Sequence, residues 1–144
     1  MIGYVVDASV AAKWCLLLSG ETLVEESLRL RDEFTAGRLP LVVPDLFWPE
    51  LGNIFWKAVR KERISGKLAD EALQATSDLR IPTFPSYPLL RDAFTIAARF
   101  QCTVYDCTYV ALAIASERPL VTADERLANT LAAHFPVRFL GSVA

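Results

Sequence analysis

Short apolar runs alternate along the chain with longer segments of helical periodicity. Four runs rich in β-branched or aromatic residues are typical of buried strands: 1–6, 39–44, 119–122 and 137–140. A fifth run, 81–85, contains two prolines, which favours a position at the edge of a sheet. Helices are expected at 10–14, 21–36, about 49–63, 66–79, 89–100, 106–116 and 125–134. Ser19 and Gly20 break the pattern after the first helix, and Gly37 is suited to end the second.

Strands separated by helices predict an α/β fold with a largely parallel sheet covered on both faces. Right-handed crossovers restrict the possible orders of the strands. The simplest arrangement runs outward from strand one to strands two and three, and then adds strands four and five on the other side. This order, 3-2-1-4-5, makes strands one and four neighbours. The crevice between their carboxyl ends is the switch point at which such sheets bind ligands.

The composition indicates a single globular domain over residues 1–144, because 53% of the residues are hydrophobic and only 22% are charged. No apolar run reaches the roughly 18 residues of a membrane-spanning helix. The first basic residue, Lys13, follows the acidic Asp7, so the chain does not begin like a signal peptide. We therefore expect a cytoplasmic protein with no membrane partner. The net charge of −2 argues mildly against a nucleic-acid partner, unless an acidic metal site offsets basic patches in the sum.

The cysteines and the single histidine limit the chemistry of any metal site. Cys15, Cys102 and Cys107 are odd in number and form no CxxC pair, which favours reduced structural thiols. His134 is the only histidine, so a zinc site built from His and Cys is not expected.

Four acidic residues follow predicted strands or begin predicted helices: Asp7, Glu50, Asp106 and Asp124. Asp7 and Asp124 follow strands one and four, so the strand order predicts that they meet at the switch point. Glu50 begins the helix after strand two, and Asp106 begins the helix that leads to strand four. Asp7 or Ser9 is also suited to cap the first helix.

Helix capping is an alternative interpretation of these acids. Thr103-x-x-Asp106 and Thr122-x-x-Glu125 both fit capping boxes, and acids in a first turn complement the helix dipole. Glu50 has no Ser or Thr three residues before it, and Asp124 lies next to the glutamate expected to complete the box. Capping therefore leaves part of the pattern unexplained.

Four carboxylates around one crevice would repel each other strongly unless a cation lay between them. Hard oxygen ligands without His or Cys select Mg²⁺ or Mn²⁺. One or two such ions, held by carboxylates and waters, are commonly used to cleave phosphodiesters. The number of ions stays open.

Four segments together resemble the PIN-domain ribonucleases, and especially the VapC-like toxins of toxin–antitoxin pairs. The segments are Val5-Val6-Asp7-Ala8-Ser9, Val43-Pro44-x4-Pro49-Glu50-Leu51-x-Asn53, Tyr105-Asp106-Cys107-x-Tyr109-Val110-Ala111-Leu112-Ala113 and Leu120-Val121-Thr122-Ala123-Asp124-Glu125-Arg126-Leu127. The resemblance covers the whole chain in the right order. It implies a PIN-like three-layer α/β/α sandwich and a metal-dependent ribonuclease that acts as the toxin of a type II pair.

The resemblance also implies roles for individual residues. Asp7, Glu50, Asp106 and Asp124 match the acidic quartet that holds Mg²⁺, or Mn²⁺, and activates water, with Asp7 and Asp106 as the firmest ligands. Supporting polar positions are matched by Ser9, Thr122 and, one turn after Glu50, Asn53. Arg126 occupies the position of a further acid in some members, so no fifth ligand is expected. The implied partners are an RNA substrate, a small cognate antitoxin and a second copy of the chain in a homodimer.

Other functions remain open. The chain is alternatively a catalytically silent PIN-like module that binds RNA or protein, or a non-toxin PIN nuclease in RNA processing. A receiver-type or phosphoryl-transfer domain is disfavoured, because Asp7-Ala8-Ser9 lacks the acidic pair that such a domain needs after its first strand.

Two surface patterns near Glu50 also have two interpretations each. The basic run Lys57, Arg60, Lys61, Arg63 and Lys67 is either a solvated helix face or a contact for RNA phosphates. The aromatic residues Phe47, Trp48, Phe55 and Trp56 are expected to lie mostly in the core. The remainder would form an apolar groove for a dimer mate or an inhibitory peptide.

Overall fold

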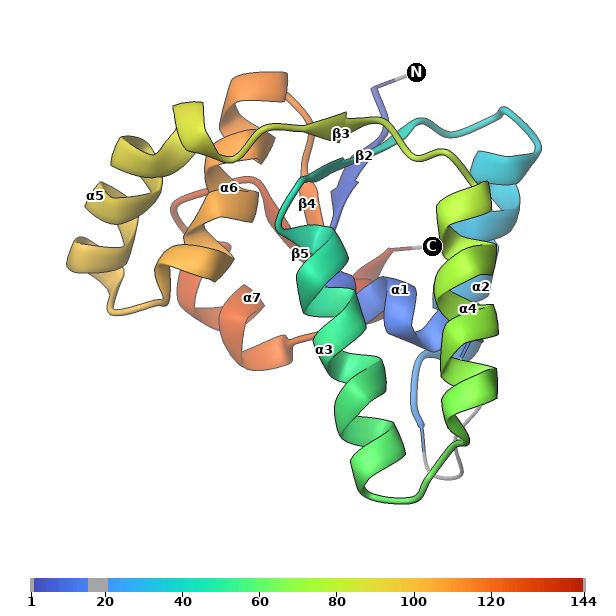
Figure 1. Ribbon diagram of the computed structural model, residues 1–144. Coiled ribbons are helices and arrows are strands. Elements are labelled where there is room, and N and C mark those ends of the chain that lie inside the picture. Colours follow the sequence, from blue (N-terminus) through green and yellow to red (C-terminus); the bar gives the residue numbers. More distant parts are fainter. Residues whose placement is uncertain (1, 16–20, 144) are drawn as a thin grey trace.

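The computed structural model describes residues 2–15 and 21–143, in which strands and helices alternate (Figure 1). The strands are β1 (Tyr4–Val6), β2 (Leu41–Pro44), β3 (Thr83–Phe84), β4 (Leu120–Thr122) and β5 (Val137–Phe139). The α-helices are α1 (Ala8–Cys15), α2 (Val24–Thr35), α3 (Phe47–Arg60), α4 (Gly66–Asp78), α5 (Leu90–Phe100), α6 (Val104–Ser116) and α7 (Glu125–Leu131). Two 3₁₀ turns, η1 (Tyr87–Leu89) and η2 (Leu140–Ser142), precede α5 and follow β5. No helix in the described ranges is long and apolar enough to cross a lipid bilayer.

The five strands form one parallel sheet in the order β3-β2-β1-β4-β5, as the pattern of the sequence predicts. Val5 of β1 pairs with Val42 of β2 on one side and with Leu120 of β4 on the other. Strand β3 lies at the edge, as predicted, and is limited to two residues between Pro82 and Pro85, which lack an N–H donor for a ladder hydrogen bond. The carboxyl ends of β1 and β4 are therefore adjacent, and the residues that follow them face the same crevice.

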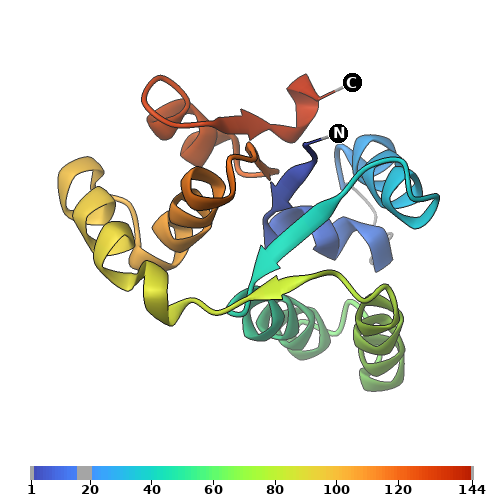
Figure 2. The same ribbon diagram turned by 90° about the horizontal axis from the view of Figure 1, so that it is seen from above.

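Helices cover both faces of the sheet. Helices α5 and α6 lie on one side and α1 and α2 on the other (Figure 2), with α6 packed against β1 and β2. Helices α3 and α4 form a neighbouring pair that extends beyond the carboxyl end of the sheet (Figure 1). The three-layer α/β/α arrangement expected from the sequence is confirmed.

The core consists of the central strands and the helices that face them. Val5, Val6, Val43, Leu120 and Val121 are fully buried. Each such side chain contributes about 1.5–3 kcal/mol by leaving water. The central strands are apolar on both faces because both faces are covered by helices.

Two buried hydrogen bonds connect helices α1 and α2. The Ser27 hydroxyl donates to the Val10 carbonyl at 2.7 Å, and the Trp14 indole N–H donates to the Ser27 carbonyl at 2.9 Å. These buried hydrogen bonds fix α2 against the helix that follows Asp7.

Several predicted boundaries were wrong by a few residues, each for a local reason. Strand β1 begins at Tyr4, because Gly3 has a φ of +78° and an added Cβ would lie 2.1 Å from the Pro40 carbonyl oxygen. Helix α2 begins at Val24 rather than at residue 21, after Leu23 with a φ of 60°. The predicted break at residues 19 and 20 lies outside the described residues, whereas Gly37, with a φ of +74°, follows the end of α2 as expected.

Three further helix ends differ from the prediction. Helix α3 ends at Arg60, before Glu62 with its positive φ of 56°. Helix α6 begins at Val104, two residues earlier than expected. Helix α7 ends at Leu131 instead of residue 134. The residue before a proline disfavours helical geometry, and Pro136 therefore requires an extended chain leading into β5.

Candidate active site

Asp7 is buried at the carboxyl end of β1, and two hydroxyl groups fix its carboxylate. Ser9 and Thr122 both donate to Oδ2 of Asp7, at 2.9 Å and 2.8 Å. The same hydroxyl oxygens accept from the next strand end: Ser9 from the Ala123 N–H at 3.1 Å, and Thr122 from the Asp124 N–H at 3.0 Å. No described side chain donates to Oδ1 of Asp7. The network therefore holds one carboxylate oxygen and leaves the other available.

Burial raises the pKa of Asp7 above its ordinary value. The hydroxyl groups of Thr122 and Ser9, and then the N–H groups of Ser9 and Ala8, act in the opposite direction by stabilising the carboxylate. Ser9 lies within the first turn of α1 and donates to Asp7, so it does not act as the side-chain cap suggested by the sequence.

Glu50 lies in the first turn of α3, half-buried and close to Asp7. Burial, together with the charges of Asp7 and Asp106, raises its pKa to about 7. Its Oε1 atom is buried and has no hydrogen-bond partner in the described part of the chain, and the same holds for the buried hydroxyl of Tyr109. The proximity of Tyr109 nevertheless lowers the pKa of Glu50 somewhat, and Glu50 in turn raises that of Tyr109. A buried carboxylate oxygen without a hydrogen-bond partner is costly, so Oε1 of Glu50 is available to a further ligand.

Asp106 lies in the first turn of α6, and its side chain does not cap that helix. The cap is Thr103, whose hydroxyl oxygen accepts from the Asp106 N–H at 3.1 Å, as the first capping pattern predicts. The carboxylate of Asp106 forms no ion pair in the described ranges, although the nearby Thr103 side chain favours its ionised form. Burial raises its pKa, and the charges of Asp7 and Asp124 raise it further.

The structure corrects the predicted cap of α7. Asp124 itself caps this helix, because its Oδ1 accepts from the Leu127 N–H at 3.1 Å. The Thr122-x-x-Glu125 capping box is therefore wrong: the Thr122 hydroxyl donates to Asp7 instead. Asp124 is exposed, and the cap occupies only one of its carboxylate oxygens.

The four carboxylates act on one another electrostatically, which places them around one crevice. The charge of Asp7 raises the pKa of Glu50 and of Asp106, and the charge of Asp124 raises that of Asp106. None of the four forms an ion pair with a basic residue in the described ranges. As they stand, no three acidic, histidine or cysteine side chains of these ranges form a ready-made metal cage.

The chemistry of these donors fits a hard divalent cation nonetheless. The donor set is entirely oxygen, Glu50 offers an orphaned carboxylate oxygen, and Asp7 has one oxygen free of side-chain donors. A divalent ion would lower the mutual repulsion that raises these pKa values. Mg²⁺ keeps several of its waters, so it does not need three direct protein ligands.

Asn53 and Tyr109 differ from what the sequence suggests about supporting residues. Asn53 is exposed and its side chain makes no hydrogen bond within the described residues, so its supporting role stays a prediction. Tyr109 was given no role by the sequence, yet it is 1% exposed and lies next to Glu50. The sequence feature that could have identified Tyr109 is its position in the apolar helix α6, three residues after Asp106. It is the hydroxyl-bearing aromatic residue on the buried side of that helix.

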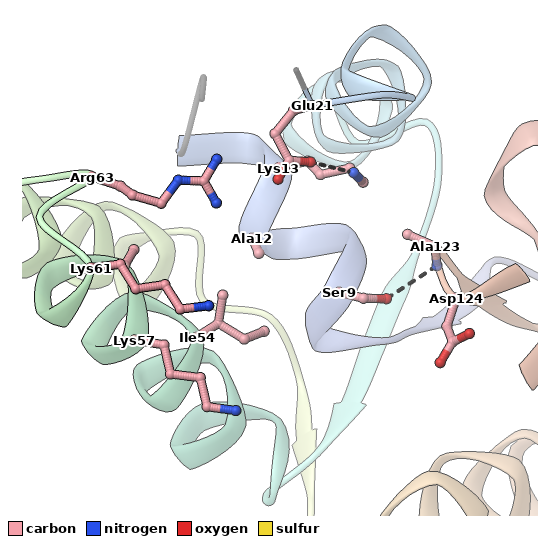
Figure 3. Close-up of a pocket in the computed structure, with 11 residues that line it drawn as sticks. Ser9, Ala12, Lys13, Glu21, Ile54, Lys57, Lys61, Arg63, Ala123 and Asp124 are labelled. Atoms are coloured by element: carbon pink, nitrogen blue, oxygen red, sulfur yellow. Dashed lines mark hydrogen bonds and ion pairs between the residues drawn. The ribbon is translucent and has the colours of Figure 1, made fainter. Parts of the chain in front are cut away.

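A pocket of about 430 Å³ opens beside this acidic site. Ser9, Ala123 and Asp124 line one end, and Lys57, Lys61 and Arg63 approach from the opposite wall (Figure 3). Acidic and basic groups therefore border one continuous hollow.

The thiol chemistry agrees with the sequence. Cys15, Cys102 and Cys107 are all free, and burial raises the pKa of Cys107 to about 12. A thiol with so high a pKa is inert at neutral pH.

The chain matches the PIN domain over residues 4–131. It belongs to the PIN-domain family. Ribonuclease VapC9 of Mycobacterium tuberculosis is 34% identical over 133 residues, which is 92% of this chain and 94% of VapC9. Ribonuclease VapC1 of the same species is 40% identical over 85 residues, which is 59% of this chain and 63% of VapC1. The chain therefore spans less than two thirds of VapC1 and almost all of VapC9.

Two solved structures share the fold. The PAE2754 protein of Pyrobaculum aerophilum superimposes with a TM-score of 0.71 and 22% identity, over 98% of this chain and 85% of that one. A toxin–antitoxin complex from Klebsiella pneumoniae contains a chain with a TM-score of 0.63 and 13% identity, over 96% of this chain and 98% of that one. The PIN fold and the relationship to VapC ribonucleases that the sequence indicates are confirmed.

Proposed function

We propose that this VapC-type PIN protein is a Mg²⁺-dependent endoribonuclease that acts as the toxin of a type II toxin–antitoxin pair. The observation that carries the proposal is the hydroxyl-clamped carboxylate of Asp7 at the β1–β4 switch point. Three further carboxylates surround it, and burial together with the charges of neighbouring carboxylates raises the pKa values of Glu50 and Asp106. Homology to VapC ribonucleases over most of the chain gives this site its reaction class.

In the proposed mechanism, Asp7 and Asp106 would hold the ion directly, and Glu50 and Asp124 would support it through water. When bound, the ion supplies charge neutralisation at the phosphate and lowers the pKa of its water. Ser9 and Thr122 keep Asp7 in one orientation, so its free oxygen needs no rearrangement. A bound cation would offset the charges of Asp7 and Asp106 that raise the pKa of Glu50, so Glu50 would be ionised and suited to take a proton from the attacking water.

The test is cleavage of a long single-stranded RNA by purified protein, with the product ends mapped by sequencing. We expect fragments in millimolar Mg²⁺ or Mn²⁺, none in EDTA, and none with Asp106→Asn. A silent PIN module would bind RNA without cutting it. Cleavage that persists in EDTA, or at an unchanged rate with Asp106→Asn, would contradict the proposed site.

The proposed partners are an RNA substrate, a small antitoxin and a second copy of the chain. A toxin of this class requires a co-expressed inhibitor, and we expect both to act in the cytoplasm, where RNA is translated. The proposed homodimer is supported by large exposed apolar side chains around the start of α5: Tyr87 (85% exposed), Leu90 (50%) and Phe94 (62%). Expression of the chain alone should arrest growth, and co-expression with the neighbouring small gene should restore it. Growth arrest that no neighbouring gene relieves would favour the alternative, a non-toxin PIN nuclease in RNA processing.

A further inference from the structure

The pocket beside the acidic site has a charge pattern that the metal chemistry does not use. We propose that this pocket binds one unpaired nucleotide of the RNA, adjacent to the phosphodiester that is cut, with Lys57, Lys61 and Arg63 holding its phosphates. The inference rests on the proposed ribonuclease function and defines how that site selects single-stranded RNA.

The position of the pocket links it to the site of cleavage. Ser9, which donates to Asp7, and Asp124, which caps α7, both line one end of the hollow. A nucleotide in this hollow therefore has a neighbouring phosphate within reach of the carboxylates. The volume of about 430 Å³ lies in the range of sites for small ligands, which suits one nucleotide rather than a helical duplex.

The wall opposite the carboxylates is basic and uncompensated. Lys57 lies in the last turn of α3, Lys61 is the C-cap residue of the same helix, and Arg63 follows in the turn after it. None of these three side chains forms an ion pair with a described acidic residue. The other basic group in the lining, Lys13, is paired with Glu21 at 2.7 Å, so it adds no net charge. Figure 3 shows Lys57, Lys61 and Arg63 directed into the hollow.

The floor of the pocket is apolar and smooth. Ala12, Ile54 and Ala58 are the aliphatic side chains that line it beside the basic and acidic residues. Small aliphatic side chains accept the flat face of a ribose or a base without hydrogen-bonding its edges. No aromatic side chain lines the pocket in the described residues. We therefore expect weak preference for base identity and strong preference for an unpaired strand.

The basic run has two possible roles by sequence, a solvated face or an RNA contact. In the structure, some of its residues line the pocket and others do not. Arg60 lies over the Trp56 ring at 5.0 Å, and Lys67 lies 3.9 Å from Glu71. Both side chains are exposed and neither lines the pocket. They provide a matched control, because removing them changes the charge of the same region without touching the pocket.

The experiment compares two triple variants with equal loss of charge. The pocket variant is Lys57→Gln/Lys61→Gln/Arg63→Gln, and the control is Arg60→Gln/Lys67→Gln/Arg91→Gln. All six positions are exposed, so both variants should fold, which circular dichroism verifies. Binding of a fluorescein-labelled eight-nucleotide single-stranded RNA of mixed sequence is measured by anisotropy in EDTA, where the ribonuclease does not cut.

We expect the pocket variant to lose at least tenfold in affinity at low salt, and the control less than threefold. Each phosphate contact on a single strand contributes about 0.7 to the slope of log affinity against log salt, so the slope should fall by about 2 in the pocket variant. A duplex of the same length should compete poorly. Equal losses in the two variants, or equal competition by duplex, would overturn the inference.

Two further outcomes separate this inference from the proposed function. Pocket-dependent RNA binding by a wild-type protein that never cuts RNA in Mg²⁺ would refute the ribonuclease and support the pocket. Metal-dependent cleavage with an unchanged KM in the pocket variant would support the ribonuclease and overturn the pocket. If the pocket variant lost binding to a partner protein while its RNA affinity stayed unchanged, the pocket would be a protein interface. That result would also overturn the inference of a nucleotide site.

Discussion

Thr122 donates a 2.8 Å hydrogen bond to Asp7, and the two residues are 115 positions apart in the sequence. The bond connects the carboxyl ends of β4 and β1, which are neighbours only because the chain crosses back over the first strand. The Thr122 oxygen also accepts from the Asp124 N–H, so a single hydroxyl orients two of the four carboxylate-bearing residues. The proposed metal site therefore depends on the order of the strands as well as on the acids themselves.

Replacing Thr122 by valine should destabilise the protein by about 1–3 kcal/mol, because it leaves a buried carboxylate oxygen and a backbone N–H short of a partner. Chemical denaturation measures this loss. Thr130→Val is the control, since the Thr130 hydroxyl only bonds to the Arg126 carbonyl on an exposed helix face. Similar losses in the two variants would show that the bond to Asp7 contributes nothing specific.

Divalent ions should raise the melting temperature, because they bind the folded state and relieve the repulsion among the carboxylates. Binding to the folded state alone adds about 2.7 kcal/mol at one hundred times the dissociation constant. Asp7→Asn should abolish most of this rise in Mg²⁺ or Mn²⁺. Asp92→Asn, which changes an exposed acid in the first turn of α5, should leave it intact. A melting curve that does not move across millimolar metal would count heavily against the site.

Asp106→Asn should separate folding from catalysis. Thr103 provides the cap of α6, so the asparagine variant should unfold at the same temperature in EDTA or slightly higher, with one repelling charge removed. A loss of a direct metal ligand should lower the cleavage rate by a factor of about 100 or more. Melting curves and a single-turnover cleavage assay on the same preparation give both numbers. A variant that cuts RNA at nearly the normal rate would exclude Asp106 as a ligand.

The sequence predicts the part of this site that follows from strand order. Alternation of apolar runs and helices is enough to place Asp7 and Asp124 at one crevice, because right-handed crossovers leave few possible arrangements. The sequence pattern could not predict which residue caps α7. Thr122 and Asp124 are both good caps, and the choice depends on Asp7, which takes the Thr122 hydroxyl from a distant part of the chain.

The remaining features required neighbours that no local pattern reveals. Glu50 has a raised pKa because packing buries it close to Asp7 and Asp106. From the sequence alone, Lys57 and Lys61 fit a solvated helix face. Only the tertiary structure shows that they line a pocket with Asp124. Local patterns specify elements and their ends, whereas electrostatic environments arise from contacts between elements.

The stability of the metal-free protein should fall as the pH rises through Glu50's titration. Its pKa is raised from 4.5 to about 7, so the folded protein keeps a proton that the unfolded chain has released between these values. The unfolded state then binds fewer protons, and the free energy of unfolding decreases with pH across this window. Asp7 and Asp106, whose pKa values are also raised, contribute in the same direction.

Melting temperatures in EDTA at pH 5, 6, 7 and 8 test this expectation. Glu50→Gln should flatten the decline, and Glu71→Gln, at an exposed position of α4, should leave it unchanged. Saturating Mg²⁺ should reduce the decline in the wild type, because a bound cation favours the ionised carboxylates. A stability that rises between pH 5 and 7 in EDTA would contradict the electrostatic description of the site.

An antitoxin that blocks this site should combine charge pairing with burial of an aromatic side chain. An arginine from the partner would pair with Asp7, Asp106 or Asp124 through its planar fork of donors, in the place of the metal. Of the aromatic residues beside Glu50, Phe47 and Phe55 are buried in the core, as the sequence predicts for most of them. Trp56, 52% exposed on α3, is the side chain that offers a surface.

We therefore expect Trp56→Ala to weaken binding of the co-expressed small partner by tenfold or more, because truncating a central tryptophan commonly costs over 1 kcal/mol at an interface. Tyr87→Ala, which removes another exposed aromatic side chain before α5, should change this affinity little. Replacing the partner's arginine by alanine should restore RNA cleavage in the complex, while leaving much of the aromatic contact in place. Titration calorimetry gives the affinities, and a cleavage assay on the purified complex gives the inhibition. If the small protein binds equally well to Trp56→Ala and still inhibits without its arginine, it acts at another surface.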